Sequence, residues 1–159
     1  MKLRQIKSVE WTIRDFVDSV DSLFFVTLTF RDLFYESDCK MILNRVLTLA
    51  RYYGFAGVWV REYQTSGRVH YHLLASGWNS KLWLYGFQQI KIVKGDSKEK
   101  LKTYLIKEFL KGKQLQNVEK GFKRWGKFGN VTRHCVRDFE MEYIIDPQCP
   151  DVKNIFKKF

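Results

Sequence analysis

The chain has 159 residues, enough for one domain with a single hydrophobic core but not for two. Hydrophobic residues make up 45% of the sequence and aromatic residues 16%, a composition that excludes a disordered basic tail. Lys and Arg number 28 against 17 Asp and Glu, and this net charge of +11 indicates a nucleic-acid partner before a membrane, although a ribosomal or nonspecific basic protein would carry the same surplus.

Cysteine usage and the N-terminus narrow the class of protein further. Cys39, Cys135 and Cys149 form no Cys-x-x-Cys pair, so a structural zinc site of the usual cysteine type is not expected, and reduced thiols fit a cytoplasmic protein. The basic first residues run into charged residues instead of an apolar stretch, which is not the pattern of a signal peptide. No segment reaches the apolar length of a membrane span, so we expect no membrane partner.

The first predicted elements are a strand and a helix. Residues 23–30 are mostly β-branched and aromatic, which predicts a central strand. Residues 37–53 carry apolar side chains at helical spacing and are followed by Gly54, which predicts a helix that ends there. The apolar residues of that helix are Met41, Ile42, Val46, Leu49 and Tyr53.

A hairpin and a further strand come next. Residues 55–63 and 68–76 have the composition of strands, and residues 64–67, with a glycine at the end, have that of a hairpin loop. Residues 87–94 predict another strand. The hairpin makes the two strands that it joins antiparallel.

The remainder of the chain predicts a second helix and a less regular basic segment. Asp96 or Ser97 caps a helix that runs to about Lys111. Residues 121–130 are basic and punctuated by glycine, and residues 132–145 are a candidate for a last strand. The order β-α-β-β-β-α predicts an α+β fold with a mostly antiparallel central sheet and helices packed on it.

The hairpin carries candidate metal ligands. Because alternate side chains of a strand share a face, His70 and His72 point the same way and Tyr71 points oppositely. Glu62 lies on the preceding strand, where the hairpin can fold it back beside them. Two histidines and one carboxylate suit a divalent ion such as Mn²⁺ or Mg²⁺ better than a closed zinc site. A hairpin with two hydrogen-bonded histidines and no metal would show the same pattern.

The second predicted helix carries a candidate nucleophile. Lys100, Tyr104, Lys107 and Lys111 follow one another at spacings of four, three and four, so they form one stripe on which the tyrosine can meet a phosphate. A solvated helix face would show the same spacing. A different arc, able to pack on the sheet, consists of Leu101, Leu105 and Phe109.

The C-terminal third interleaves cations with aromatic residues. Such a mixture suits phosphate contacts and base stacking on a single DNA strand, but a basic loop with its aromatic residues in the core is the alternative interpretation. The segment contains Lys123, Arg124, Trp125, Lys127, Phe128, Arg133 and Arg137.

Three motifs occur in an order that resembles the HUH endonucleases, in particular the single-tyrosine initiator proteins of rolling-circle replication. The first motif of that family is an apolar strand that contains threonine, and residues 25–30 match it. His-hydrophobe-His matches residues 70–72, with Glu62 upstream, and Tyr-x-x-Lys matches residues 104–107. The motif core spans about residues 23–111, and the resemblance makes residues 1–159 one HUH domain with a basic C-terminal segment, 112–159.

The resemblance implies a metal-dependent transesterification on single-stranded DNA at a replication origin. Glu62, His70 and His72 would hold Mn²⁺ or Mg²⁺, and Tyr104 would attack the phosphate, leaving a 5′-phosphotyrosine link and a free 3′-OH. Lys107 would stabilise the phosphate or assist the phenol. The sequence has no GxxxxGK[ST] phosphate loop, so unwinding would need a separate helicase or DNA torsion, beside a separate polymerase. The expected setting is the cytoplasm of a prokaryotic host, with a phage or plasmid gene.

Other functions remain open on the sequence alone. A single-tyrosine insertion-sequence transposase has the same motif order and a similar length. A noncatalytic nucleic-acid-binding module would also account for the charge. Conjugative relaxases usually place the tyrosine before the histidines, so the order found in this chain argues against them.

Overall fold

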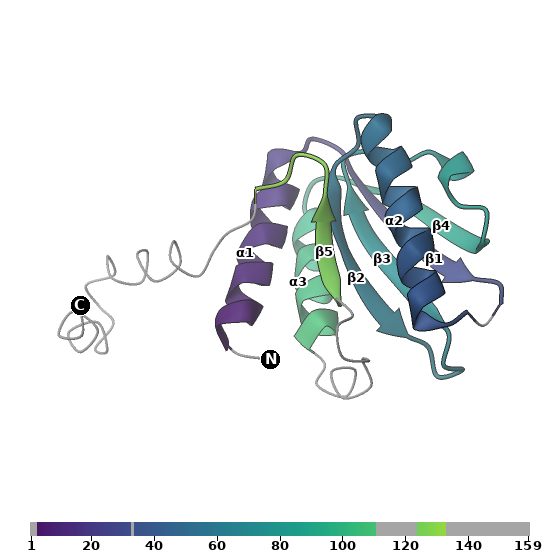
Figure 1. The fold of residues 1–159 in the computed structure, drawn as a ribbon. Coiled ribbons are helices and arrows are strands. Elements are labelled where there is room, and N and C mark those ends of the chain that lie inside the picture. The colour runs from purple at the N-terminus through teal and green to yellow at the C-terminus, as the bar shows by residue number, and fades with distance from the viewer. Residues whose placement is uncertain (1–2, 33, 111–123, 133–159) are drawn as a thin grey trace, which may run out of the picture.

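The computed structural model describes residues 3–32, 34–110 and 124–132. These residues form a five-stranded sheet with three α-helices and one short 3-10 helix (Figure 1). In chain order the elements are α1 (Leu3–Ser19), β1 (Leu23–Phe30), α2 (Glu36–Tyr52), β2 (Gly57–Tyr63), β3 (Val69–Ala75), η1 (Ser80–Leu82), β4 (Gly86–Val93), α3 (Ser97–Leu110) and β5 (Trp125–Phe128). None of these helices is both long enough and apolar enough to pass through a membrane.

The strands lie in the order β4-β1-β3-β2-β5, and each pair of neighbours is antiparallel. The predicted α+β fold with an antiparallel sheet is therefore confirmed. Residues directly opposite each other on antiparallel strands share a face. Two such pairs are Glu62 with His70 and Thr27 with His72, so both pairs can meet on one face of the sheet.

Helices cover both faces of the sheet. The sheet therefore divides the hydrophobic core into two layers. On one face Val26 and Leu28 of β1 pack with α2, which lies in front of the sheet in Figure 1. On the other face Leu23 and Phe25 pack with α1 and α3. Side-chain alternation along β1 explains this division, because consecutive residues point to opposite faces. The same alternation along β2 and β3 puts the three candidate metal ligands on the face of α1 and α3.

Helix α1 was not predicted from the sequence. Val9, Ile13, Phe16 and Val17 are all buried at spacings of four, three and one, which is the pattern of an amphipathic helix. The helical periodicity of α1 is thus present in the sequence.

The buried stripe of α2 also differs from the predicted one. Ile42 and Val46 are buried as expected, but Met41, Leu49 and Tyr53 are about half exposed, at 48%, 51% and 54%. The stripe that faces the sheet consists of Cys39, Ile42, Leu43, Val46, Leu47 and Ala50. The helix is therefore rotated slightly from the predicted orientation.

The basic C-terminal segment contributes one strand that was not predicted. β5 pairs with β2 at the edge of the sheet, with Gly126 opposite Trp59. A Cβ atom at Gly126 would lie 2.8 Å from the Trp59 ring, so glycine allows this close approach. The candidate strand at residues 132–145 lies outside the described residues, apart from Thr132.

Candidate metal centre

The β2–β3 hairpin sets the register of the candidate ligands. Gln64 N donates to Arg68 O and Gly67 N donates to Gln64 O, each at 2.8 Å. Gly67 has a φ of +80°, a conformation that glycine adopts without strain. This turn places Glu62 directly opposite His70. The expected loop, residues 64–67, would instead have paired Tyr63 with Arg68, whereas in the structure Tyr63 pairs with Val69.

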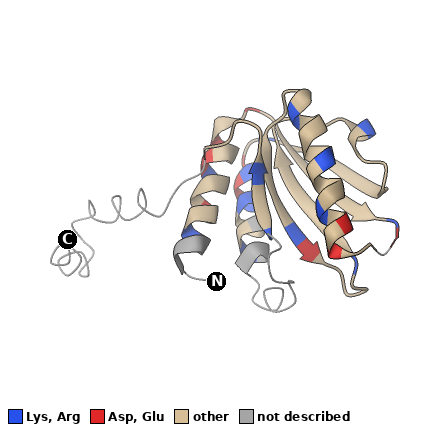
Figure 2. Cartoon of the chain, viewed as in Figure 1, with Lys and Arg blue, Asp and Glu red and all other residues tan. Residues whose placement is uncertain are grey.

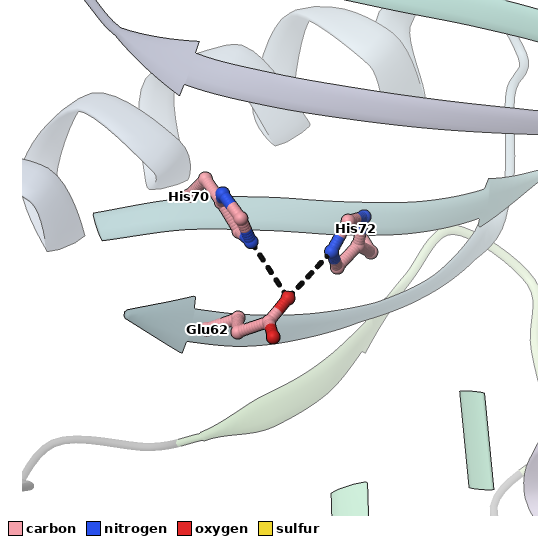
Figure 3. A group of neighbouring side chains, drawn as sticks. All are labelled: Glu62, His70 and His72. Carbon is pink, nitrogen blue, oxygen red and sulfur yellow. Dashed lines mark hydrogen bonds and ion pairs between the residues drawn. The ribbon is translucent and has the colours of Figure 1, made fainter. Parts of the chain in front are cut away.

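The three candidate ligands converge on one point (Figure 3). Glu62 Oε2 accepts hydrogen bonds from His70 Nε2 at 2.6 Å and from His72 Nε2 at 2.8 Å. The ligand atoms of all three residues lie within 4.8 Å of one another. Ligand atoms bound to one ion at about 2.1 Å lie roughly 3–4 Å apart, so this cluster could hold a metal ion after small movements.

Burial and neighbouring side chains fix the ring of His72. The residue is 7% exposed, and its ring stacks on that of Phe25 with centroids 5.5 Å apart and planes 15° apart. Thr27 Oγ1 lies 3.1 Å from His72 Nδ1, whereas Glu62 contacts Nε2. Nε2 of His72 is therefore the nitrogen directed at the candidate metal position, since Nδ1 is occupied by Thr27.

Helix α3 brings the candidate nucleophile to the same place. The ring of Tyr104 contacts that of His72 edge-on, with centroids 6.5 Å apart, and Tyr104 is 43% exposed. Lys100 and Lys107 are exposed on the same helix. A surface cavity of about 530 Å³ is lined by Asp96, Glu99, Lys100, Thr103, Tyr104 and Lys107. A phosphate in this cavity would meet the phenol and two cations, but also two carboxylates.

Ion pairs with α1 hold α3 in this position. Lys102 is buried, and its Nζ lies 2.6 Å from Glu99 Oε2 and 3.2 Å from Asp18 Oδ1 of α1. Arg14 of α1 binds Glu99 as well, at 3.2 Å. Lys102 is two positions from Tyr104, so the two side chains point to nearly opposite sides of the helix. The ion pairs thus fix which side of α3 faces the histidines.

The tyrosines that flank the candidate ligands point away from them. Tyr71 is buried on the α2 side of the sheet, where burial raises the pKa of its phenol. Tyr63 packs against the same core. Strand alternation predicts this placement for both residues.

The α2 side also contains a buried ion pair that was not predicted from the sequence. Arg61, which is 4% exposed, binds Glu36 in the first turn of α2. Arg61 N also donates to Arg124 O at 2.7 Å. Burial, followed by the charge of Arg61, lowers the pKa of the Arg124 guanidinium. These contacts tie β2, the strand of Glu62, to α2 and to the residue before β5.

The predicted DNA-binding residues divide into three groups. Lys100 is exposed on α3, and Lys127 is exposed on β5 with its Nζ bonded to Val131 O at 2.6 Å. Arg124 and Trp125 are partly buried, and Trp125 packs against the core on the side of α1. Lys111, Lys123 and Arg133 lie outside the described residues. Phe128, by contrast, is in the core, as the alternative interpretation of this segment expected.

Basic residues are present on both sides of the described sheet (Figure 2). They lie along α2 as well as along α3 and β5. The charge surplus alone therefore does not single out one face of the sheet.

The fold and the cluster define an α+β protein with a candidate two-histidine, one-carboxylate centre on its sheet, beside a helix that carries a tyrosine. A family model, described as that of the replication-associated protein ORF2, matches residues 23–145. The match covers more than half of the chain, so the chain belongs to this family. No curated protein and no solved structure matches the chain.

Proposed function

We propose that the chain is a metal-dependent, single-tyrosine endonuclease of the HUH type, which nicks single-stranded DNA to start and end rolling-circle replication. The observation that carries this proposal is the edge-on contact between Tyr104 and His72, beside a cluster of two histidines and one glutamate. Membership of a replication-associated family supports the biological setting. The nuclease core corresponds to residues 23–111, and the basic segment 112–159 adds affinity for DNA.

Glu62, His70 and His72 are the residues that would hold the ion. Two nitrogen ligands and one oxygen ligand leave positions open for substrate oxygens, and hard divalent ions accept this donor set. Mn²⁺ or Mg²⁺, when bound there, polarises the scissile phosphate and stabilises the charge that develops on its oxygens.

Tyr104 is the nucleophile of the proposed reaction. Its phenolic oxygen loses a proton and forms a bond to phosphorus, while the bond from phosphorus to the 3′ oxygen breaks. The 3′ oxygen takes up a proton and leaves as a free 3′-OH, and the 5′ phosphate stays on the tyrosine. Because a phosphodiester is exchanged for a phosphodiester, a 3′-OH can reverse the step.

The cations of α3 hold the phosphate for this attack. Lys107 is one turn beyond Tyr104 and lines the same cavity, so its ammonium can neutralise a phosphate oxygen as charge builds up. Lys100 lines the cavity one turn before Tyr104. The strand on either side of the scissile phosphate contacts the basic and aromatic side chains near β5 through charge and base stacking. These side chains are Arg124, Trp125 and Lys127. The contacts are extended by Lys111, Lys123 and Arg133.

The test is covalent capture. The purified chain is incubated with labelled single strands and Mn²⁺, with and without a chelator, and adducts are separated on a denaturing gel. We expect a shifted, labelled band that requires the metal ion. His70→Ala should abolish the band while most DNA affinity remains, because charge supplies most of that affinity.

A matched control is Arg45→Ala, which removes an exposed cation on α2, on the opposite face of the sheet. It should leave adduct formation unchanged. Absence of an adduct with every origin-derived strand, in the presence of normal DNA binding, would favour a noncatalytic binding module. Joining of paired element ends, without rejoining of an origin strand, would favour a transposase.

A further inference from the structure

We propose that Thr27 is a positioning residue, which holds His72 in the orientation and tautomer that present Nε2 to the metal ion. This inference rests on the proposed function, since it concerns the same centre. Thr27 lies on β1, directly opposite His72 of β3, and its hydroxyl is 3.1 Å from His72 Nδ1. The two residues are 45 positions apart in the sequence, and only the pairing of β1 with β3 brings them together.

The ring of His72 is restrained on three sides. Phe25 stacks on its face, Tyr104 meets it edge-on, and Thr27 occupies Nδ1. Stacking alone would allow the ring to turn over by about 180° about χ2, which exchanges the positions of its nitrogen and carbon atoms. The bond to Thr27 distinguishes these two orientations, because only one of them places a nitrogen at the hydroxyl and the other nitrogen at Glu62.

A hydroxyl suits this position because it both donates and accepts. If Nε2–H of a neutral imidazole donates to Glu62, then Nδ1 accepts from Thr27 Oγ1–H across the 3.1 Å contact. A metal ion held at Nε2 would require the ring proton to be on Nδ1, and Nδ1–H would then donate to Thr27 Oγ1. The hydroxyl reverses its role without moving. A carboxylate or carbonyl oxygen could only accept, so it could bond Nδ1 only when Nδ1 carries the proton.

His70 provides the contrast within the same centre. Its Nδ1 is buried, and no hydrogen-bond partner for it is found among the described residues. Thr29 lies opposite His70 just as Thr27 lies opposite His72, yet the Thr27 contact is the one that forms. Mutation of a residue that bonds the outer nitrogen of a metal-bound histidine typically lowers metal affinity or activity by about 10- to 100-fold. Loss of the opposing hydroxyl should therefore affect His72, which has such a bond, and not His70.

The experiment compares Thr27→Val, Thr27→Ser and Thr29→Val with the unsubstituted chain. Valine has nearly the shape of threonine and favours strands, so Thr27→Val removes the hydroxyl and preserves the fold. Mn²⁺ affinity is measured by calorimetry on the DNA-free protein. We expect Thr27→Val to weaken binding by about 10-fold or more. Thr27→Ser should restore most of the affinity, and Thr29→Val should bind as the unsubstituted chain does.

A second readout does not depend on the metal ion. Nitrogen chemical shifts of the metal-free protein report the tautomer of each ring, and the chain has only three histidines to assign. We expect His72 to be protonated at Nε2 in the unsubstituted chain and to become a mixture of tautomers in Thr27→Val. The spectrum of His70 should not change.

Three outcomes would overturn the inference. Equal Mn²⁺ affinity of Thr27→Val and the unsubstituted chain would remove the role of Thr27 and leave the proposed function intact. A loss that Thr27→Ser does not restore would show that the hydroxyl is not its cause. Failure of the unsubstituted chain to bind Mn²⁺ at all would overturn both this inference and the metal-dependent part of the proposed function.

Discussion

The ring of Tyr104 meets the ring of His72 edge-on, at an interplanar angle of 81°. The two residues come from a helix and a strand that are well separated in the sequence, and the contact places a phenol beside a candidate metal ligand. The remaining 43% exposure of Tyr104 leaves the residue accessible to a substrate from solvent. A nucleophile needs both properties, proximity to the electrophile and access to it.

Tyr104→Phe should therefore separate chemistry from structure. The substitution keeps the ring and its contact with His72 but removes the attacking oxygen. We expect DNA affinity and thermal stability close to those of the unsubstituted chain, and loss of both nicking and the covalent adduct. Mass spectrometry of the adduct identifies the modified residue.

The matched control is Tyr52→Phe, at a tyrosine that is 89% exposed on α2. This variant should nick DNA normally. Discovery of the nucleotide on another tyrosine, or cleavage by Tyr104→Phe, would refute the assignment of the nucleophile.

The buried Arg61–Glu36 pair gives a prediction about stability. Removal of one partner from a buried ion pair leaves an uncompensated charge, and typically costs about 3–5 kcal/mol. We expect Arg61→Met to lower the free energy of unfolding by about that amount, as measured by urea denaturation. Because Glu36 also lies in the first turn of α2, where a negative charge is favoured, Glu36→Gln should lose a helix-dipole contribution as well.

The double variant Arg61→Met with Glu36→Leu serves as the control. Replacing both charges by apolar groups removes the uncompensated charge, so most of the stability should return. A double variant as unstable as Arg61→Met alone would mean that the loss comes from packing of the arginine side chain.

Lys100 gives a prediction about salt dependence. If its ammonium contacts a phosphate of a single strand, Lys100→Ala should reduce the magnitude of the slope of log K against log salt by about 0.7. The slope is obtained from fluorescence anisotropy of a labelled oligonucleotide at several salt concentrations. Arg45→Ala, on the opposite face, should leave the slope unchanged. An identical slope in Lys100→Ala would place the DNA elsewhere.

Cys39 gives a prediction about pH. Burial, followed by the negative charge of Glu36, raises the pKa of this thiol from 9.0 to about 11. The folded state therefore holds the thiol proton more tightly than the unfolded state does. The protein should lose stability as the pH rises from about 9 towards 11, because only the unfolded thiol ionises freely in that range.

Alkylation and urea denaturation both measure this effect. At about pH 8, native Cys39 should react with iodoacetamide far more slowly than in urea, as followed by peptide mass spectrometry. In Cys39→Ala, the decline of stability between about pH 9 and pH 11 should become shallower. Rapid alkylation of the native thiol would contradict its burial between α2 and the sheet.

The local parts of the site could be predicted from the sequence. Residues 55–76 carry strand composition on both sides of a loop that ends in Gly67, so the hairpin itself was predictable. Its exact register was not, because the expected loop 64–67 would have placed Glu62 opposite Val69, whereas the structure places Glu62 opposite His70. The helix that carries Tyr104 was equally visible, since its cap and its end both have clear residue signals.

Contacts between strands that are distant in the sequence could not be predicted in this way. The strand of Thr27 pairs with that of His72, and nothing in either strand's own residues specifies its neighbour, because strand order depends on how the two core layers pack. The sequence therefore assigned Phe25 and Thr27 only to an apolar strand motif and did not predict their contacts with His72.

The short strand β5 was missed for a different reason. Two of its own residues, Gly126 and Lys127, are of types that are uncommon in strands, and it is flanked by Arg124 and Gly129. Its pairing with β2 therefore depends on the neighbouring strand and not on a strong strand propensity of its own.

The family match begins at residue 23, just after the end of α1. The packing of α1 nevertheless makes it part of the same folding unit, since its Val9, Ile13 and Phe16 belong to the core cluster that includes side chains of α3. A fragment that starts at residue 23 would expose an apolar surface beside the tyrosine helix and leave Lys102 without Asp18. Expression of the matched segment alone should thus yield an aggregation-prone protein, and swapping α1 between relatives would require exchange of its partners on α3 as well.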